Sequence, residues 1–133
     1  MQNYRKLNVW QSSHSFILDV YSVTKAFPSD ERYGLISQLR RACASVSTNI
    51  AEGSMRSSPA AFAFFLEIAA SSATECDCQL LIARDLGYLS VEEYTSLVTD
   101  LTSIRRRLAR LRSEVLRAAN RQSAPRKPQS KNQ

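Results

Sequence analysis

Apolar residues recur along most of this chain at intervals of three and four, the spacing that places them on one face of an α-helix. Four stretches share the pattern, and they predict helices over residues 8–27, 30–53, 59–86 and 91–120. No stretch shows the strict alternation of a half-buried strand. The pattern therefore predicts an all-α protein. Four long helices with short connections favour an antiparallel up-down-up-down four-helix bundle in a single domain.

The same spacing predicts which side chains form the core. The fourth stretch is the most regular, because apolar residues occupy every a and d position over more than three heptads. That regularity is typical of helices that pack with a left-handed supercoil. The residues expected to face the core are Val9, Phe16, Val20, Val23, Phe27, Leu35, Ile36, Leu39, Cys43, Val46, Ile50, Phe62, Phe65, Ala69, Ala73, Cys76, Leu80, Ala83, Tyr94, Leu97, Leu101, Ile104, Leu108, Leu111, Val115 and Ala118.

Residues typical of helix ends separate the four stretches. We expect Ser29 to cap the start of the second helix. Gly53 or Ser54 is expected to end that helix, and Gly87 to end the third. Ser90 and Glu93 have the spacing of a capping box at the start of the fourth helix.

Positive charge is concentrated in the last quarter of the chain. Residues 1–100 carry 8 Lys and Arg against 11 Asp and Glu, whereas residues 101–133 carry 10 against the single acid Glu114. Residues 1–119 are expected to form the bundle, and residues 120–133, which lack apolar periodicity, a disordered basic tail. Such an asymmetry suggests a polyanionic partner.

Seven arginines of the fourth helix lie outside its apolar seam and predict a face that binds RNA or DNA. Guanidinium groups suit phosphate because two of their donors can bind two oxygens. The alternatives are a merely solvated face or pairing with acidic residues of another subunit. The seven are Arg105, Arg106, Arg107, Arg110, Arg112, Arg117 and Arg121.

The second and third helices carry further polar candidates. Arg40, Arg41 and Arg56 form a second possible nucleic-acid-binding set. The other hypothesis for this region is a polar network between helices or subunits, which would fix register rather than add much stability. Its expected members are Asn49, Glu52, Glu67 and Glu75.

Little in the sequence predicts catalysis. A di-iron bundle needs two Glu-x-x-His motifs, but the chain has one histidine, His14, preceded by Gln11 at that spacing. Cys76 and Cys78 point to nearly opposite sides of a helix and cannot easily share a metal. We therefore expect no enzymatic activity, no metal and no cofactor. The longest run without Asp, Glu, Lys or Arg is residues 7–18, twelve residues, whereas a membrane helix needs about 20 apolar residues, so a cytoplasmic protein is expected.

Several short sequence blocks occur in an order that resembles a known family. They are Val9-Trp10-Gln11, Tyr33-Gly34-Leu35, Gln38-Leu39-Arg40-Arg41, Asn49-Ile50-Ala51-Glu52-Gly53 and Leu86-Gly87-Tyr88-Leu89. Across roughly residues 5–118 the chain is similar to the four-helix-bundle proteins encoded within intervening sequences of bacterial 23S ribosomal RNA genes, also called S23-type proteins.

The resemblance implies a four-helix bundle that assembles as a ring-like homopentamer and has no established catalytic activity. Related accessory proteins of diversity-generating retroelements bind nucleic acid. The leading hypothesis is therefore a homo-oligomeric accessory or scaffold protein that binds RNA or DNA. The alternative is a protein-interaction scaffold whose arginines bind an acidic protein partner, without nucleic-acid binding. Neither hypothesis includes a membrane.

Overall fold

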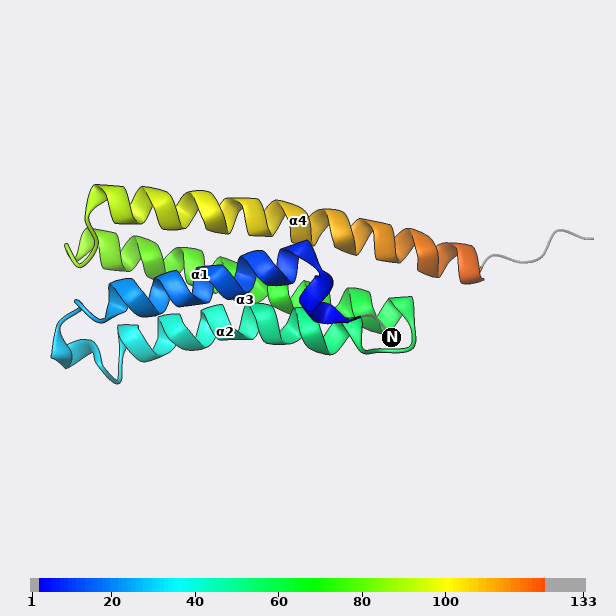
Figure 1. The fold of residues 1–133 in the computed structure, drawn as a ribbon, viewed down its shortest axis with the longest axis horizontal. Helices are drawn as coiled ribbons and strands as arrows, with labels where there is room; N and C mark the ends of the chain where they lie inside the picture. The colour runs from blue at the N-terminus through cyan, green and yellow to red at the C-terminus, as the bar shows by residue number, and fades with distance from the viewer. Residues whose placement is uncertain (1–2, 124–133) are drawn as a thin grey trace, which may run out of the picture.

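The computed structural model describes residues 3–123, apart from the side chains of residues 122 and 123. These residues contain helices and no strand. Figure 1 shows that successive long helices run in opposite directions along one axis. The predicted all-α four-helix bundle is therefore confirmed. The elements are η1 (Tyr4–Lys6), α1 (Asn8–Thr24), η2 (Ser29–Glu31), α2 (Leu35–Ser54), α3 (Pro59–Asp85) and α4 (Val91–Ser123), where η marks a 3₁₀-helix.

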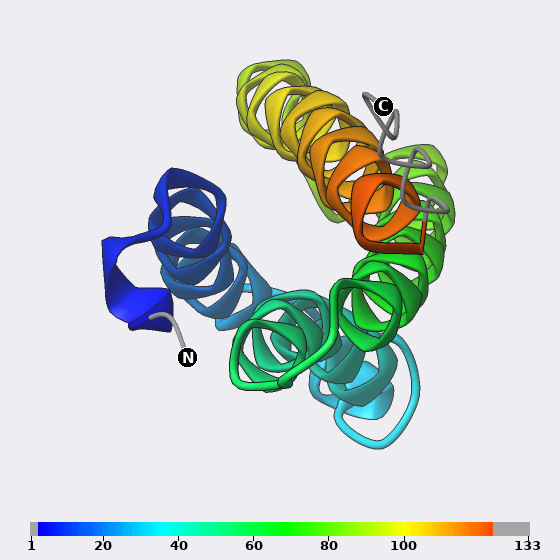
Figure 2. The ribbon, with the colours of Figure 1, turned by 90° about the vertical axis from the view of Figure 1, so that its right-hand side faces the viewer.

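The helices follow one another around the bundle in chain order. Figure 2 looks along the helices and shows α2 diagonally opposite α4, and α1 diagonally opposite α3. The last turns of α4 project beyond the ends of the other three helices (Figure 1). Because α4 continues to Ser123, the predicted tail boundary at residue 120 falls inside a helix, and residues 124–133 lie outside the described part of the chain. No helix within residues 3–123 is long and apolar enough to cross a membrane.

The core consists largely of the side chains that the periodicity predicts. On α3, however, Leu66 is fully buried, while the neighbouring Phe65 lies partly exposed at the edge of the α2–α3 contact. On α4, Leu108 is buried, but Leu111 and Val115 are only partly buried although they continue the same heptads. The heptads therefore extend past the point where the other helices can cover them.

The helix ends show where local sequence was decisive. The capping box is present, since the Glu93 N–H donates to Ser90 Oγ (3.0 Å) and the Ser90 N–H donates to Glu93 Oε1 (2.9 Å). Gly87 has a φ of +78° and ends α3, and the N–H of the following Tyr88 donates to the Ala83 carbonyl at 2.9 Å. This bond is typical of a glycine-terminated helix.

The start of α2 differs from the prediction. Ser29 does not cap it, because residues 29–31 form the separate 3₁₀-helix η2 and α2 begins at Leu35. The carboxylate of Glu31 performs the capping role instead, accepting a hydrogen bond from the Leu35 N–H at 3.2 Å. A side chain four residues before the helix therefore satisfies one of its free N–H groups.

Gly53 serves the fold through its lack of a side chain. It lies within α2, is buried, and has no positive φ. A Cβ atom added there would lie 2.8 Å from Phe65 Cβ and 2.9 Å from Phe62 Cδ1. α2 ends at Ser54, one of the two residues expected to end it, so Gly53 itself does not end the helix through its backbone conformation. The residue allows α3 to approach α2 closely.

Gly53→Ala should lower the free energy of unfolding by about 1–3 kcal/mol, because the added methyl group overpacks the contact with α3. Chemical denaturation followed by circular dichroism would measure the change. Thr48→Ala, on the exposed side of the same helix, is the matched control and should change stability little. Equal stability of the two variants would show that the close approach is not needed.

Candidate nucleic-acid interface

Two of the seven α4 arginines tie α4 to α3. Arg105 donates from Nη2 to Thr74 Oγ1 at 3.2 Å and lies 3.8 Å from Asp77 Oδ2 through Nη1. Arg112 comes one heptad later, so it faces the same neighbour. Its Nη2 lies 3.5 Å from Glu67 Oε2. Some of the hydrogen-bond donors of these two guanidinium groups are therefore occupied by contacts with α3.

Arg107 faces the opposite side of α4 and contacts α1. Its Nη1 donates a hydrogen bond to Ser12 Oγ at 2.8 Å. Because successive helix residues differ by about 100°, Arg105 and Arg107 reach different neighbours although they are two residues apart. The predicted arginine-rich face is thus divided between the two flanks of α4 and its outer side.

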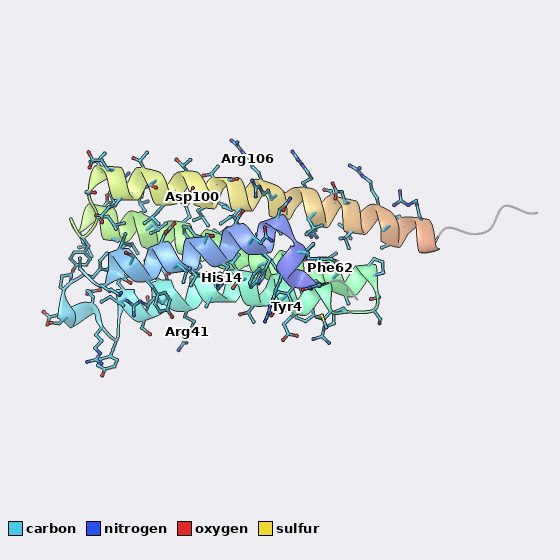
Figure 3. The ribbon with its side chains drawn as sticks, viewed as in Figure 1. Tyr4, His14, Arg41, Phe62, Asp100 and Arg106 are labelled. Atoms are coloured by element: carbon cyan, nitrogen blue, oxygen red, sulfur yellow. The ribbon has the colours of Figure 1, made fainter. Side chains whose placement is uncertain are left out.

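The four remaining arginines form an outer row on α4. They are exposed, and within residues 3–123 none of them forms a hydrogen bond or an ion pair with another side chain. Figure 3 shows Arg106 pointing away from the bundle. The row extends over about 22 Å at the rise of an α-helix. Its members are Arg106, Arg110, Arg117 and Arg121.

Hydroxyl groups lie beside the first half of the outer row. Thr99, Thr102 and Ser103 line a shallow groove of about 510 Å³ together with Arg106 and Arg110. Hydroxyls can donate to phosphate oxygens, as guanidinium groups do. The Thr99 hydroxyl already donates to the Thr95 carbonyl at 2.8 Å, so the neutral donors beside this end of the row are Thr102 and Ser103.

Arg40 does not belong to this surface. Its Nε donates to Thr24 Oγ1 at 2.9 Å, and its guanidinium lies 4.3 Å from the centre of the Tyr21 ring. A third contact, from Nη2 to the Tyr21 carbonyl, measures 3.3 Å. These contacts fasten α2 to α1, so Arg40 has a structural role in the bundle.

Arg41 and Arg56 are also separated from the outer row. Arg41 is exposed on α2, on the opposite side of the molecule from Arg106 (Figure 3). Arg56 pairs with Glu52 at 3.3 Å and lies over the Phe65 ring. The two candidate arginine sets therefore do not form one continuous surface.

The predicted polar network is present only in part. Asn49 Nδ2 donates to Ser45 Oγ at 3.0 Å and to the Ser45 carbonyl at 2.8 Å. Ser45 Oγ in turn lies 2.8 Å from Ser72 Oγ on α3. Sequence reasoning missed these two serines. The signal that could have found them is the many alanines and serines of the third helix, which let another helix approach closely.

The three glutamates expected in that network lie elsewhere. Glu52 pairs with Arg56 on the same helix, and Glu67 pairs with Arg112 of α4. Glu75 is exposed and forms no ion pair with the described residues. The network between α2 and α3 therefore consists of an amide and hydroxyls, without carboxylates.

His14 is exposed and stacks on the Trp10 ring, with 5.0 Å between ring centres. Among the residues that the structure describes, no three His, Cys, Asp or Glu side chains gather as a metal site would require.

Comparison with known proteins assigns the bundle to a family. A sequence model of the family described as "23S rRNA-intervening sequence protein" matches residues 5–110. The chain belongs to this family. A comparison with curated proteins found no match. The family match includes Arg106 and Arg110 but ends before Arg117 and Arg121, so the outer row extends beyond the matched segment.

A solved structure supports the assignment to the 23S rRNA-intervening sequence family. It is the crystal structure of a protein with unknown function from the S23 ribosomal protein family of Bacteroides thetaiotaomicron. The two share 27% sequence identity and a TM-score of 0.70, over 75% of this chain and 94% of the other.

Arg40→Ala should lower the free energy of unfolding by about 1–2 kcal/mol, because it removes a charged hydrogen bond and a cation–π contact. The adjacent Arg41→Ala removes the same side chain from an exposed position and should change stability little. Thermal or urea unfolding of the two variants would test this difference. A larger loss for Arg41→Ala would contradict the assigned roles.

Proposed function

We propose that this protein is a non-enzymatic, homo-oligomeric, cytoplasmic member of its family that binds RNA or DNA through the outer row of α4 and acts as an accessory or scaffold. The observation that carries the proposal is the row itself. Four guanidinium groups lie on one side of a helix and have no ion-pair or hydrogen-bond partner among the described residues. Exposed guanidinium groups that pair with no acid of their own chain are available to bind a polyanion.

Phosphate backbones fit the row better than bases do. Its length of about 22 Å corresponds to about six phosphates along one strand at 3.4 Å each. The only aromatic residue of α4 is Tyr94, and Arg84 lies over its ring at 4.8 Å. Stacking on unpaired bases therefore has little support here. We expect contacts to a duplex or to structured RNA, with little sequence preference.

Exposed apolar side chains near both ends of α3 support self-association. They are Phe64 near its start, Ile82 near its end and Leu86 at its C-cap, with exposed fractions of 59%, 49% and 55%. Apolar residues thus lie on both the inner and the outer side of this helix, as is typical of helices covered on two sides. The family resemblance suggests a ring-like homopentamer. Such a ring would repeat the outer row in each subunit and raise avidity.

Changing Arg106, Arg110, Arg117 and Arg121 together to Gln should abolish most binding to duplex DNA and structured RNA. The plot of log affinity against log salt concentration should become shallower by about three units, because up to four phosphate contacts are lost. Fluorescence anisotropy over a salt series would measure both effects. The charge-matched control changes four exposed cations outside both candidate sets, Arg5, Lys6, Lys25 and Arg32, to Gln.

An equal loss in both variants would show that net charge matters and the row does not. If the unaltered protein fails to bind even at low salt, nucleic-acid binding is excluded. The row would then be better explained by the alternative function, in which it contacts carboxylates of an acidic protein partner.

Phe64→Ser combined with Ile82→Ser should dissociate the oligomer while leaving the helical content intact, because both side chains are exposed in the single chain. Sedimentation velocity would give the assembly state. Leu18→Ser with Tyr33→Ser is the control, since these side chains are also exposed but lie outside α3. A monomeric unaltered protein would refute self-association, whereas an unchanged oligomer in the α3 variant would place the subunit contact elsewhere.

A further inference from the structure

Two cysteines face each other across the contact between α2 and α3. Cys43 Sγ lies 3.3 Å from Cys76 Sγ, and both are free thiols. The side chains are almost fully enclosed, with exposed fractions of 1% and 0%. A disulfide bond measures about 2.05 Å, so the two sulfur atoms need to move together by only about 1.2 Å to form one.

Other contacts between α2 and α3 keep the two sulfur atoms close to each other. Two residues further along α2, Ser45 Oγ lies 2.8 Å from Ser72 Oγ of α3, so a hydrogen bond joins the same two helices. Further along, Gly53 lets α3 approach closely. The helices are therefore fastened by close contacts beyond the thiol pair, and neither can easily rotate away from it.

We propose that Cys43 and Cys76 form an oxidative modification site, at which hydrogen peroxide or a small disulfide converts the two thiols to a disulfide that joins α2 to α3. One S–H bond of each cysteine breaks and one S–S bond forms. The two electrons and two protons pass to the oxidant. Peroxide is thereby reduced to two water molecules, or a small disulfide to two thiols. A dithiol reductant reverses the reaction.

Burial sets the rate of this reaction. The hydrogen bond with Cys76 and burial raise the pKa of the Cys43 thiol, so the reactive thiolate is scarce at neutral pH. Oxidation of the folded protein therefore proceeds slowly, depends on brief opening of the α2–α3 contact, and accelerates as the pH rises. Cys78 is exposed on the other side of α3 and reacts faster, but it has no second thiol within reach on the described surface.

Cross-linking should stabilise the bundle. The linked residues are 33 positions apart, and the loop between them contains the turn that joins α2 to α3. Closing a loop of this length restricts the unfolded chain. We expect the thermal midpoint to rise by roughly 5–15 °C on oxidation.

The test uses the folded Cys78→Ser protein, treated separately with hydrogen peroxide and with glutathione disulfide. This background is needed because trypsin leaves residues 57–84, which contain both Cys76 and Cys78, in one peptide, while Cys43 falls in residues 42–56. Mass spectrometry should find these two peptides joined with the loss of two hydrogen atoms, and separated again by dithiothreitol. Cys43→Ser in the same background should give no joined peptide.

The protein that keeps Cys78 is the control for reactivity. Its exposed Cys78 should be oxidised or glutathionylated under the same conditions, which shows that the oxidants are active. If Cys78 reacts while Cys43 and Cys76 remain alkylatable after unfolding, the proposal is overturned. It is also overturned if the joined peptide forms only in denaturant, or if oxidation lowers the thermal midpoint. These outcomes are independent of nucleic-acid binding and of assembly.

Discussion

The close contact between α2 and α3 determines much of the rest of the structure. Gly53 leaves no side chain between α2 and the two phenylalanines of α3, so the helix backbones can approach closely. At that separation small groups fill the contact, including the Ser45 and Ser72 hydroxyls and the two facing thiols. Phe64 and Ile82 of α3 lie away from this contact and stay exposed.

The rotation of α4 separates its arginines by role. Arg105 and Arg112, one heptad apart, meet acids of α3, while Arg107 meets a serine of α1. Contacts on both flanks fix the angle of the helix about its own axis. Arg106, the first residue of the outer row, then points away from the bundle (Figure 3). A helix can in this way use some cations to dock and leave others for a partner, because its period distributes adjacent residues over different sides.

Features set by local sequence were predictable, and features set by neighbouring helices were not. The helices, the capping box and Gly87 follow from residues close in sequence, and each was predicted. Arg40 and Arg41 look equivalent in the sequence, yet a rotation of about 100° places one over Tyr21 and the other in solvent. Gly53 similarly suggested a helix end until the position of Phe65 was known.

The outer row of arginines begins inside the segment that matches the family and continues beyond its end. The family match ends at residue 110, and the last turns of α4 project beyond the other helices (Figure 1). Arg117 and Arg121 lie in the last two turns of α4, after Val115, the last heptad position that packs, only partly buried, against the core. Substitutions there cost little core packing. A partner-binding surface on this projection can therefore change in evolution while the bundle stays the same.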